Sequence, residues 1–272
     1  MNQFLKDIDN IPPNIKCIQG DKGTFRNWPI GDCFFGVPES KLYGRETLID
    51  LPESTTRFHF YLGSESKALV QSFVGSNFIA TVESLYIGNS SYNNGKGREY
   101  SDIINELEKS PGFPNLRLFS IGVWQLFSNS HCWFGNLGNI TNLLDKMPNL
   151  EVLSINGNFI LDKPFHLSKL KSLFVEIDDY VTCINGGYPT VLTISNLLSS
   201  FLPKLTDLYV NLECTEDSPS YVIPDALLAG DLFPELEEFE LVGQFIPGSK
   251  EKLSNSQFAL KPGCKFFIED IV

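Results

Sequence analysis

A short pattern of apolar positions recurs along the chain. It consists of an apolar residue, two variable residues, Leu or Phe, one variable residue, and then Ile, Val or Leu. Six segments follow it: Val82-Glu-Ser-Leu85-Tyr-Ile87, Leu116-Arg-Leu-Phe119-Ser-Ile121, Leu150-Glu-Val-Leu153-Ser-Ile155, Leu170-Lys-Ser-Leu173-Phe-Val175, Leu205-Thr-Asp-Leu208-Tyr-Val210 and Leu236-Glu-Glu-Phe239-Glu-Leu241. Their first positions are separated by 34, 34, 20, 35 and 31 residues. Six occurrences at such steps indicate an internal structural repeat.

Each repeat predicts one β-strand and one helix. The last two apolar positions of the pattern are two residues apart, so their side chains point to one side of a strand. A proline precedes four of the strands, where its missing N–H costs no ladder hydrogen bond; these are Pro114, Pro148, Pro203 and Pro234. Apolar residues at helical spacing predict helices within 101–109, 140–147, 194–201 and 227–232.

The repeats predict a fold in which successive units stack. Strands joined by crossover helices run parallel, and one such unit cannot bury its apolar face alone. We therefore expect an α/β, leucine-rich-repeat-like solenoid, with a parallel sheet on the concave side and helices on the convex side. We expect a single domain over 1–272, with an irregular N-terminal cap (1–56), repeats (57–243) and a C-terminal cap (244–272). Within these parts, 56–62 suits a first strand and 264–268 a final edge strand.

The segment from Val82 to Gly243 resembles a bacterial leucine-rich-repeat family found beside, or fused to, WGR domains, the molybdate-regulator-like group. The resemblance rests on Val82-Glu-Ser-Leu-Tyr-Ile-Gly88, Phe113-Pro-Asn-Leu-Arg-Leu-Phe-Ser-Ile-Gly122, Met147-Pro-Asn-Leu-Glu-Val-Leu-Ser-Ile155, Trp133 with the helix beginning near Ile140, and Phe233-Pro-Glu-Leu-Glu-Glu-Phe239. It implies a cytoplasmic bacterial protein without an established reaction, acting as an interaction scaffold. No WGR tripeptide occurs in this chain, and the asparagine ladder of leucine-rich repeats is largely missing, because only one strand is followed by such a pair, Asn156 and Asn158.

The residues that carry catalysis or metal binding in other proteins form no recognisable motif here. The six cysteines are at least 16 residues apart, so no CxxC or comparable zinc spacing exists. His59 lies in the first predicted strand, where we expect a structural side chain, and His166 has no local carboxylate partner. His131 is adjacent to Cys132, a spacing that rarely makes a nucleophile and its base. Gly95-Lys96-Gly97 lacks the remaining residues of a P-loop. We therefore predict no enzyme and no cofactor, and we keep an ion-dependent or enzymatic use of the acidic loops, such as the one at Asp178-Asp179, as an alternative.

The alternation of the strands assigns a second, outward face. Side chains between the apolar positions point away from the core, and we expect this acidic and aromatic face, the concave side of the sheet, to be exposed and to bind a protein partner. The candidate residues are Ser84, Tyr86, Ser154, Asn156, Phe174, Glu176, Asp207, Tyr209, Asn211, Glu238 and Glu240. Exposed aromatic residues flanked by charges are typical of protein recognition. The loops at 124–136 and 178–190 are the competing site.

The charge of the chain narrows the class of partner. The sequence has 33 acidic residues against 21 Lys and Arg, for a net charge of −12, which disfavours nucleic acid and anionic membranes as partners. The excess is local, because residues 170–240 contain 13 acids and only two bases, Lys171 and Lys204. We expect a partner of basic or mixed charge, with immunity-type neutralisation of a basic toxin as an alternative. The start of the chain lacks an apolar signal-peptide core, which predicts a cytoplasmic protein.

Overall fold

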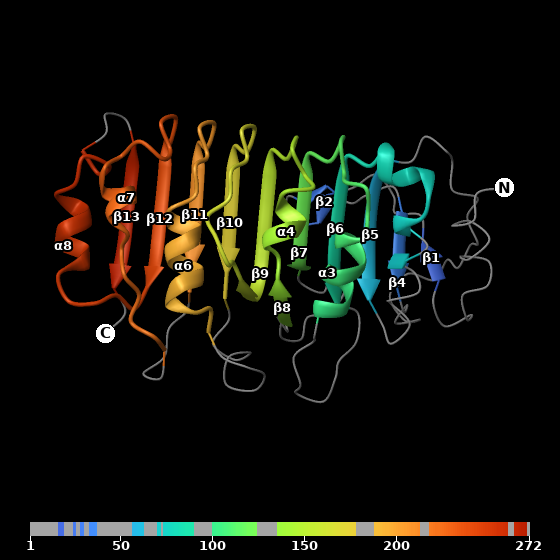
Figure 1. The fold of residues 1–272 in the computed structure, drawn as a ribbon, viewed down its shortest axis with the longest axis horizontal. Coiled ribbons are helices and arrows are strands. Elements are labelled where there is room, and N and C mark those ends of the chain that lie inside the picture. Colours follow the sequence, from blue (N-terminus) through green and yellow to red (C-terminus); the bar gives the residue numbers. More distant parts are fainter. Residues whose placement is uncertain are drawn as a thin grey trace.

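A mostly parallel β-sheet forms the centre of the protein. The computed structural model describes residues 16–18, 24–25, 28–29, 33–36, 56–62, 70–71, 73–89, 100–123, 135–177, 188–212, 218–260 and 264–270. Over these residues the fold is α/β, and Figure 1 shows the strands side by side with the helices along one face of the sheet. The class predicted from the repeat, an α/β fold with a parallel sheet, is therefore confirmed.

The strands follow one another across the sheet nearly in chain order. The order is β1 (Lys16–Ile18), β4 (Cys33–Gly36), β5 (Arg57–Leu62), β6 (Ser84–Asn89), β7 (Leu118–Val123), β9 (Val152–Ile160), β10 (Ser172–Glu176), β11 (Asp207–Asn211), β12 (Glu238–Gly243) and β13 (Lys265–Asp270). All neighbours from β4 to β13 run parallel, whereas β1 is antiparallel to β4. A separate two-stranded sheet joins β2 (Thr24–Phe25) to β3 (Trp28–Pro29).

The predicted apolar positions of the strands form the core in register. Leu153 of β9 pairs with Leu173 of β10, and Ile155 pairs with Val175, and each of these side chains is buried. The same alignment continues across β11 and β12 through Leu208 with Phe239. Burying an aliphatic side chain of this size contributes roughly 1.5–3 kcal/mol. Because each unit adds the same pair of positions, the core extends as a continuous ridge under the helices.

The proline-containing turns set the start of each strand. The N–H of Leu116 donates to the carbonyl of Phe113 at 3.3 Å, and Pro114 therefore occupies the second position of the turn, where its fixed φ is favourable. The carboxamide of Asn149, in the next such turn, donates to the carbonyl of Pro114 at 2.6 Å. Neighbouring repeats are thus joined at these turns by side-chain hydrogen bonds as well as by the sheet.

The helices are α3 (Ser101–Glu108), α4 (Thr141–Leu144), α6 (Val191–Leu198), α7 (Asp225–Leu228) and α8 (Ser249–Ser254), with the 3-10 helix η1 (Asn77–Ala80) before β6. Four of them, α3, α4, α6 and α7, overlap the predicted ranges, whereas α8 and η1 were not predicted. Thr190 is the N-cap of helix α6, and its hydroxyl accepts a hydrogen bond from the N–H of Thr193 at 3.1 Å. Its apolar side, with Ile194, Leu197 and Leu198, is buried against the sheet.

Two parts of the sheet differ from the prediction, and a third agrees with it. The segment expected to be an irregular cap contributes β1 and β4, so it is not irregular throughout. The expected edge strand β13 is present and continues the parallel register of β12. Strand β8 (Gly135–Asn139) was not predicted, and it pairs with the second half of β9. Its sequence, Gly-Asn-Leu-Gly-Asn, lacks the β-branched and aromatic residues that usually mark a strand.

Glycine is required where β7 and β9 come together. Gly122 has φ +78°, and a Cβ atom there would lie 1.7 Å from the carbonyl oxygen of Asn156. Both the backbone conformation and this approach exclude a larger residue.

Candidate interaction surface

The face of the sheet turned away from the core presents side chains from four neighbouring strands at its C-terminal end. We name these twelve residues the β10–β13 face: Ser172, Phe174, Glu176, Asp207, Tyr209, Asn211, Glu238, Glu240, Val242, Lys265, Phe267 and Glu269. They form three rows across the strands, because the four strands are in parallel register. Neighbouring strands lie about 4.8 Å apart, so residues within one row are adjacent on the surface.

The middle row of this face is aromatic and acidic. It consists of Phe174, Tyr209, Glu240 and Phe267, which are paired in that order from β10 to β13. Phe174 is 38% exposed and Phe267 is 49% exposed, whereas Tyr209 and Glu240 are half-buried. On the opposite side of the same strands, Val175, Val210 and Leu241 are fully buried. Large apolar side chains on a solvent-exposed row are a common feature of binding surfaces.

Several polar residues of the β10–β13 face are already held by neighbours. Asp207 accepts hydrogen bonds from the hydroxyls of Ser172 at 3.1 Å and Thr206 at 2.7 Å. Lys265 forms an ion pair with Glu238. The carboxamide of Asn211 donates to the hydroxyl of Tyr209 at 3.3 Å. These contacts fix the side chains of the rows. They also engage the carboxylates of Asp207 and Glu238 with donors or a cation from neighbouring residues.

The predicted exposure of the outward side chains on β6 and β9, which lie before the β10–β13 face, is wrong. Tyr86, Ser154 and Asn156 are 5%, 3% and 7% exposed, and Ser120 between them is fully buried. Asn156 turns back onto the sheet, because its carboxamide donates to the Ser154 hydroxyl at 3.0 Å and to the Ile121 carbonyl at 3.4 Å. Burial raises the pKa of Tyr86 to about 12, although the nearby charge of Arg57 lowers it. Ser84 is half-buried. The accessible candidates are therefore Ser84 on β6 and those on β10–β12.

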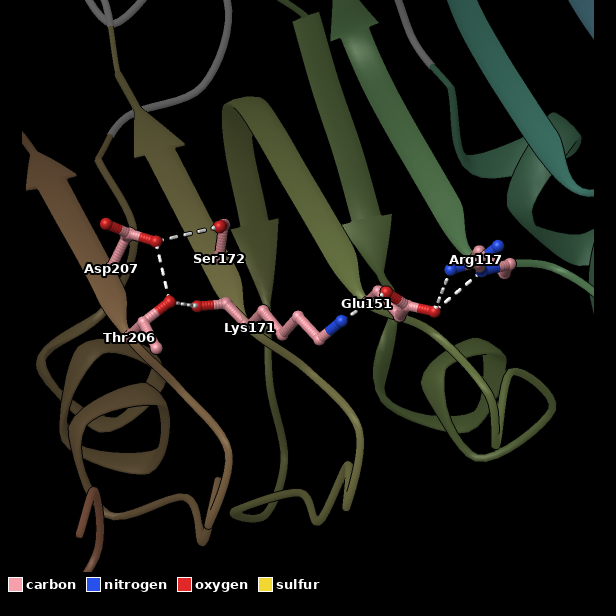
Figure 2. A network of polar contacts seen from close by, with 6 residues as sticks. All are labelled: Arg117, Glu151, Lys171, Ser172, Thr206 and Asp207. Carbon is pink, nitrogen blue, oxygen red and sulfur yellow. Dashed lines mark hydrogen bonds and ion pairs between the residues drawn. The ribbon is translucent and has the colours of Figure 1, made fainter. Parts of the chain in front are cut away.

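A ladder of charged side chains crosses the start of the strands. Figure 2 shows Glu151 between Arg117 and Lys171, each from a neighbouring unit. The carboxylate lies 2.6 Å from the Arg117 guanidinium and 2.8 Å from the Lys171 ammonium. Hydrogen bonds from these two groups lower the pKa of Glu151 to about 2, against the smaller opposing effect of burial. Sequence reasoning missed this ladder, although its three members occupy the same variable position of consecutive repeats.

The ion pairs leave the β10–β13 face with an acidic excess. Lys171 is paired with Glu151, and Lys204 is paired with Glu235, and neither acid belongs to the face. The two bases of the segment 170–240 are thus engaged elsewhere. On the face itself, five carboxylates stand against the single ammonium of Lys265, a formal charge of −4. A surface of this kind raises the local concentration of cationic partners.

Five residues of this face were not among the predicted candidates: Ser172, Val242, Lys265, Phe267 and Glu269. Phe267 and Lys265 belong to β13, which we expected only as a cap strand. The signal was present in the sequence, because Cys264-Lys-Phe-Phe-Ile268 has the same alternation as the repeats and its second aromatic residue falls on the outward side. Extending the register by one strand would have found Phe267.

Other candidate sites have no counterpart in the described ranges. Most of the two competing loops, at 124–134 and 178–187, lies outside the described residues. His131 and the side chain of His59 also lie outside them. Nδ1 of His166 lies 3.1 Å from the carbonyl of Phe201, and the two rings stack.

Within the described residues no group of three His, Cys, Asp or Glu residues could hold a metal ion. Among the same residues, no helix has the length and apolarity needed to cross a membrane.

Comparison with known proteins gives no relative. No protein-family model, curated protein or solved structure matches the chain.

Proposed function

We propose that the protein is a non-enzymatic interaction scaffold that binds a protein partner through its β10–β13 face. The observation that carries the proposal is the row Phe174, Tyr209, Glu240 and Phe267, in which an acidic residue lies between a half-buried and an exposed aromatic residue and a second exposed aromatic residue follows. Aromatic anchors supply a large share of the affinity at protein interfaces, and surrounding charges select the partner.

The architecture supports this use. We infer that the chain is a leucine-rich-repeat-like solenoid, since each unit adds one in-register parallel strand and most units add a helix on the same face. In such a stack the sheet is rigid and its outward residues are fixed by the backbone register, so a partner meets a preformed surface. The concave side of the arc would be the side of the β10–β13 face, as in other solenoids with this order of elements.

The acidic excess favours a partner of basic or mixed charge. The carboxylates at Glu176, Asp207 and Glu240 lie on the face, whereas Lys171 and Lys204 are held by acids beside it. A cationic partner would be steered toward this part of the molecule and would bind faster at low ionic strength.

Affinity capture from the native cell, followed by mass spectrometry, tests the proposal. The wild-type chain should retain a partner that the Phe174→Arg/Tyr209→Ala chain loses, because the double change removes two aromatic anchors and adds a positive charge. Leu192→Arg is the matched control, since Leu192 is 60% exposed on α6, on the helical side. Capture that is equal for the double variant and the wild type would contradict the proposal.

A further inference from the structure

Glu240 occupies a distinctive position on the β10–β13 face. It pairs in register with Tyr209 of β11 on one side and with Phe267 of β13 on the other. Neighbouring strands of a sheet lie about 4.7–4.9 Å apart, so residues paired in register are adjacent on its surface. Glu240 thus lies between two aromatic residues of the row, of which one is half-buried and one is 49% exposed.

This carboxylate differs from the other acids around it. Asp207 is bonded to two hydroxyls, and Glu238 is paired with Lys265. Within the described part of the chain, no hydrogen bond or ion pair engages the carboxylate of Glu240, although its residue is half-buried. A partly buried carboxylate gains more from a cation than a fully hydrated one does, because less water screens the interaction.

We propose that Glu240, Tyr209 and Phe267 form a seat for an arginine side chain of the partner, a proposal that rests on the proposed function of this face. A guanidinium is planar, so it can stack on an aromatic ring while its edge donates two hydrogen bonds to a carboxylate. Lysine offers only a compact ammonium, which cannot make both contacts at once. The three residues thus select arginine over lysine.

Neighbouring residues fit the same partner. Phe174 lies beyond Tyr209 in the same row and offers an apolar contact next to the seat. Asp207 and Glu238 lie in the adjacent row and would attract a second base on the partner. An extended segment with an arginine stacked on Tyr209 and an apolar residue two positions later reaches both contacts, since alternate residues of a strand are about 6.6–6.8 Å apart and Phe174 lies one strand, about 4.8 Å, beyond Tyr209.

Titration with two synthetic peptides tests the seat. The probes are Ac-Gly-Arg-Gly-Phe-Gly-NH2 and the same peptide with Lys in place of Arg. Their binding is monitored through the NMR chemical shifts of the Tyr209 and Phe267 rings. We expect the arginine peptide to bind about fivefold more tightly than the lysine peptide, because its guanidinium gains a stacking contact with an aromatic ring. Glu240→Gln should abolish the shifts, whereas Glu251→Gln, which removes an acid from α8, should leave them unchanged. Tyr209→Leu should retain weak binding and lose the preference for arginine.

The outcomes separate this inference from the proposed function. Equal affinity for the two peptides, an unchanged titration in Glu240→Gln, or no shift up to roughly 10 mM peptide would overturn the arginine seat. If the Phe174→Arg/Tyr209→Ala chain nevertheless loses its partner in the capture experiment, the binding face stands and only the seat fails. If the double variant retains its partner, the proposed function fails.

Discussion

The carboxylate of Glu151 accepts a hydrogen bond from Nε of Arg117 at 2.6 Å, although the two residues are 34 positions apart. That separation is one structural repeat, so both occupy the same position of consecutive units. Lys171, in the following unit, binds the other oxygen of the same carboxylate. A repeat in the chain is thus converted into a line of alternating charge across the sheet, shown in Figure 2.

Replacing Glu151 by Gln should lower the free energy of unfolding at pH 7 by about 1 kcal/mol, since two largely exposed cations lose one shared carboxylate. The folded-state pKa of about 2 lies below the ordinary value of 4.5, so the contribution is complete above pH 4.5 and disappears as the pH falls toward 2. Urea denaturation of both chains at pH 7 and pH 3 measures it. Asp145→Asn, which removes one exposed pair with Lys163, is the control with a smaller loss. A difference between wild type and Glu151→Gln that stays constant from pH 7 to pH 3 would contradict the ladder.

Gly122→Ala should destabilise the protein by more than about 3 kcal/mol, because the added Cβ meets the Asn156 carbonyl oxygen and the backbone is left-handed. Gly248→Ala provides a matched control. Gly248 has φ +84°, close to that of Gly122, but a Cβ there would have no atom within 4 Å. Gly248→Ala should lower the free energy of unfolding only through the left-handed backbone conformation, by about 1–2 kcal/mol. Thermal unfolding of the two variants compares them, and equal losses would show that the approach of β7 to Asn156 is not tight.

Ser200→Ala should cost about 1–3 kcal/mol, because the buried hydroxyl accepts from the N–H of Phe165 at 3.1 Å and donates to the carbonyl of Asn196 at 2.9 Å. Ser110 occupies the same position, two residues after α3 as Ser200 is after α6. Its hydroxyl is buried and has no hydrogen-bond partner in the described structure. Ser110→Ala should therefore change stability by less than about 0.5 kcal/mol. Guanidinium denaturation of both variants gives the two values, and similar losses would contradict this assignment.

The association rate of the captured partner should fall as salt rises, because a formal charge of −4 on the face attracts it over about a Debye length. Replacing Glu176 and Glu240 by Gln should lower the rate at low ionic strength and flatten its salt dependence. Glu108→Gln at the end of α3 removes an acid from the helical layer and should leave both unchanged. Stopped-flow or surface-plasmon measurements at several salt concentrations provide the rates, and a salt-independent rate for the wild type would argue against steering.

The sequence predicted the strands and helices of the repeats, and it missed burial on the outward face, strand β8 and the charged ladder. The pattern around Leu153 and Leu173 located the strands and their buried positions, because period-two alternation reports directly on the two faces of a strand. The alternation does not show whether the outward face is exposed to solvent. Tyr86 and Ser154 were therefore expected to be exposed, and they are buried. Strand β8 was missed because its residues have low β-propensity and it is held by pairing with β9.

The candidate site was predicted in part for a related reason. Phe174, Tyr209 and Glu240 follow from alternation within the repeats, and the structure places them in one row. Phe267 completes that row but lies beyond the last recognised repeat. Which acids are compensated could not be read from the sequence, since Lys171 and Lys204 bind Glu151 and Glu235, acids that lie 20 and 31 residues away.

The dissociation constant of the captured partner tests the central claim most directly, when it is measured for the Phe174→Arg/Tyr209→Ala chain beside the Leu192→Arg chain. If the β10–β13 face carries binding, the double variant should bind at least about 100-fold more weakly, because two anchor residues of an interface together contribute several kcal/mol. The Leu192→Arg chain should bind as the wild type does. Equal dissociation constants for the two variants, with both folded as judged by circular dichroism, would contradict the account.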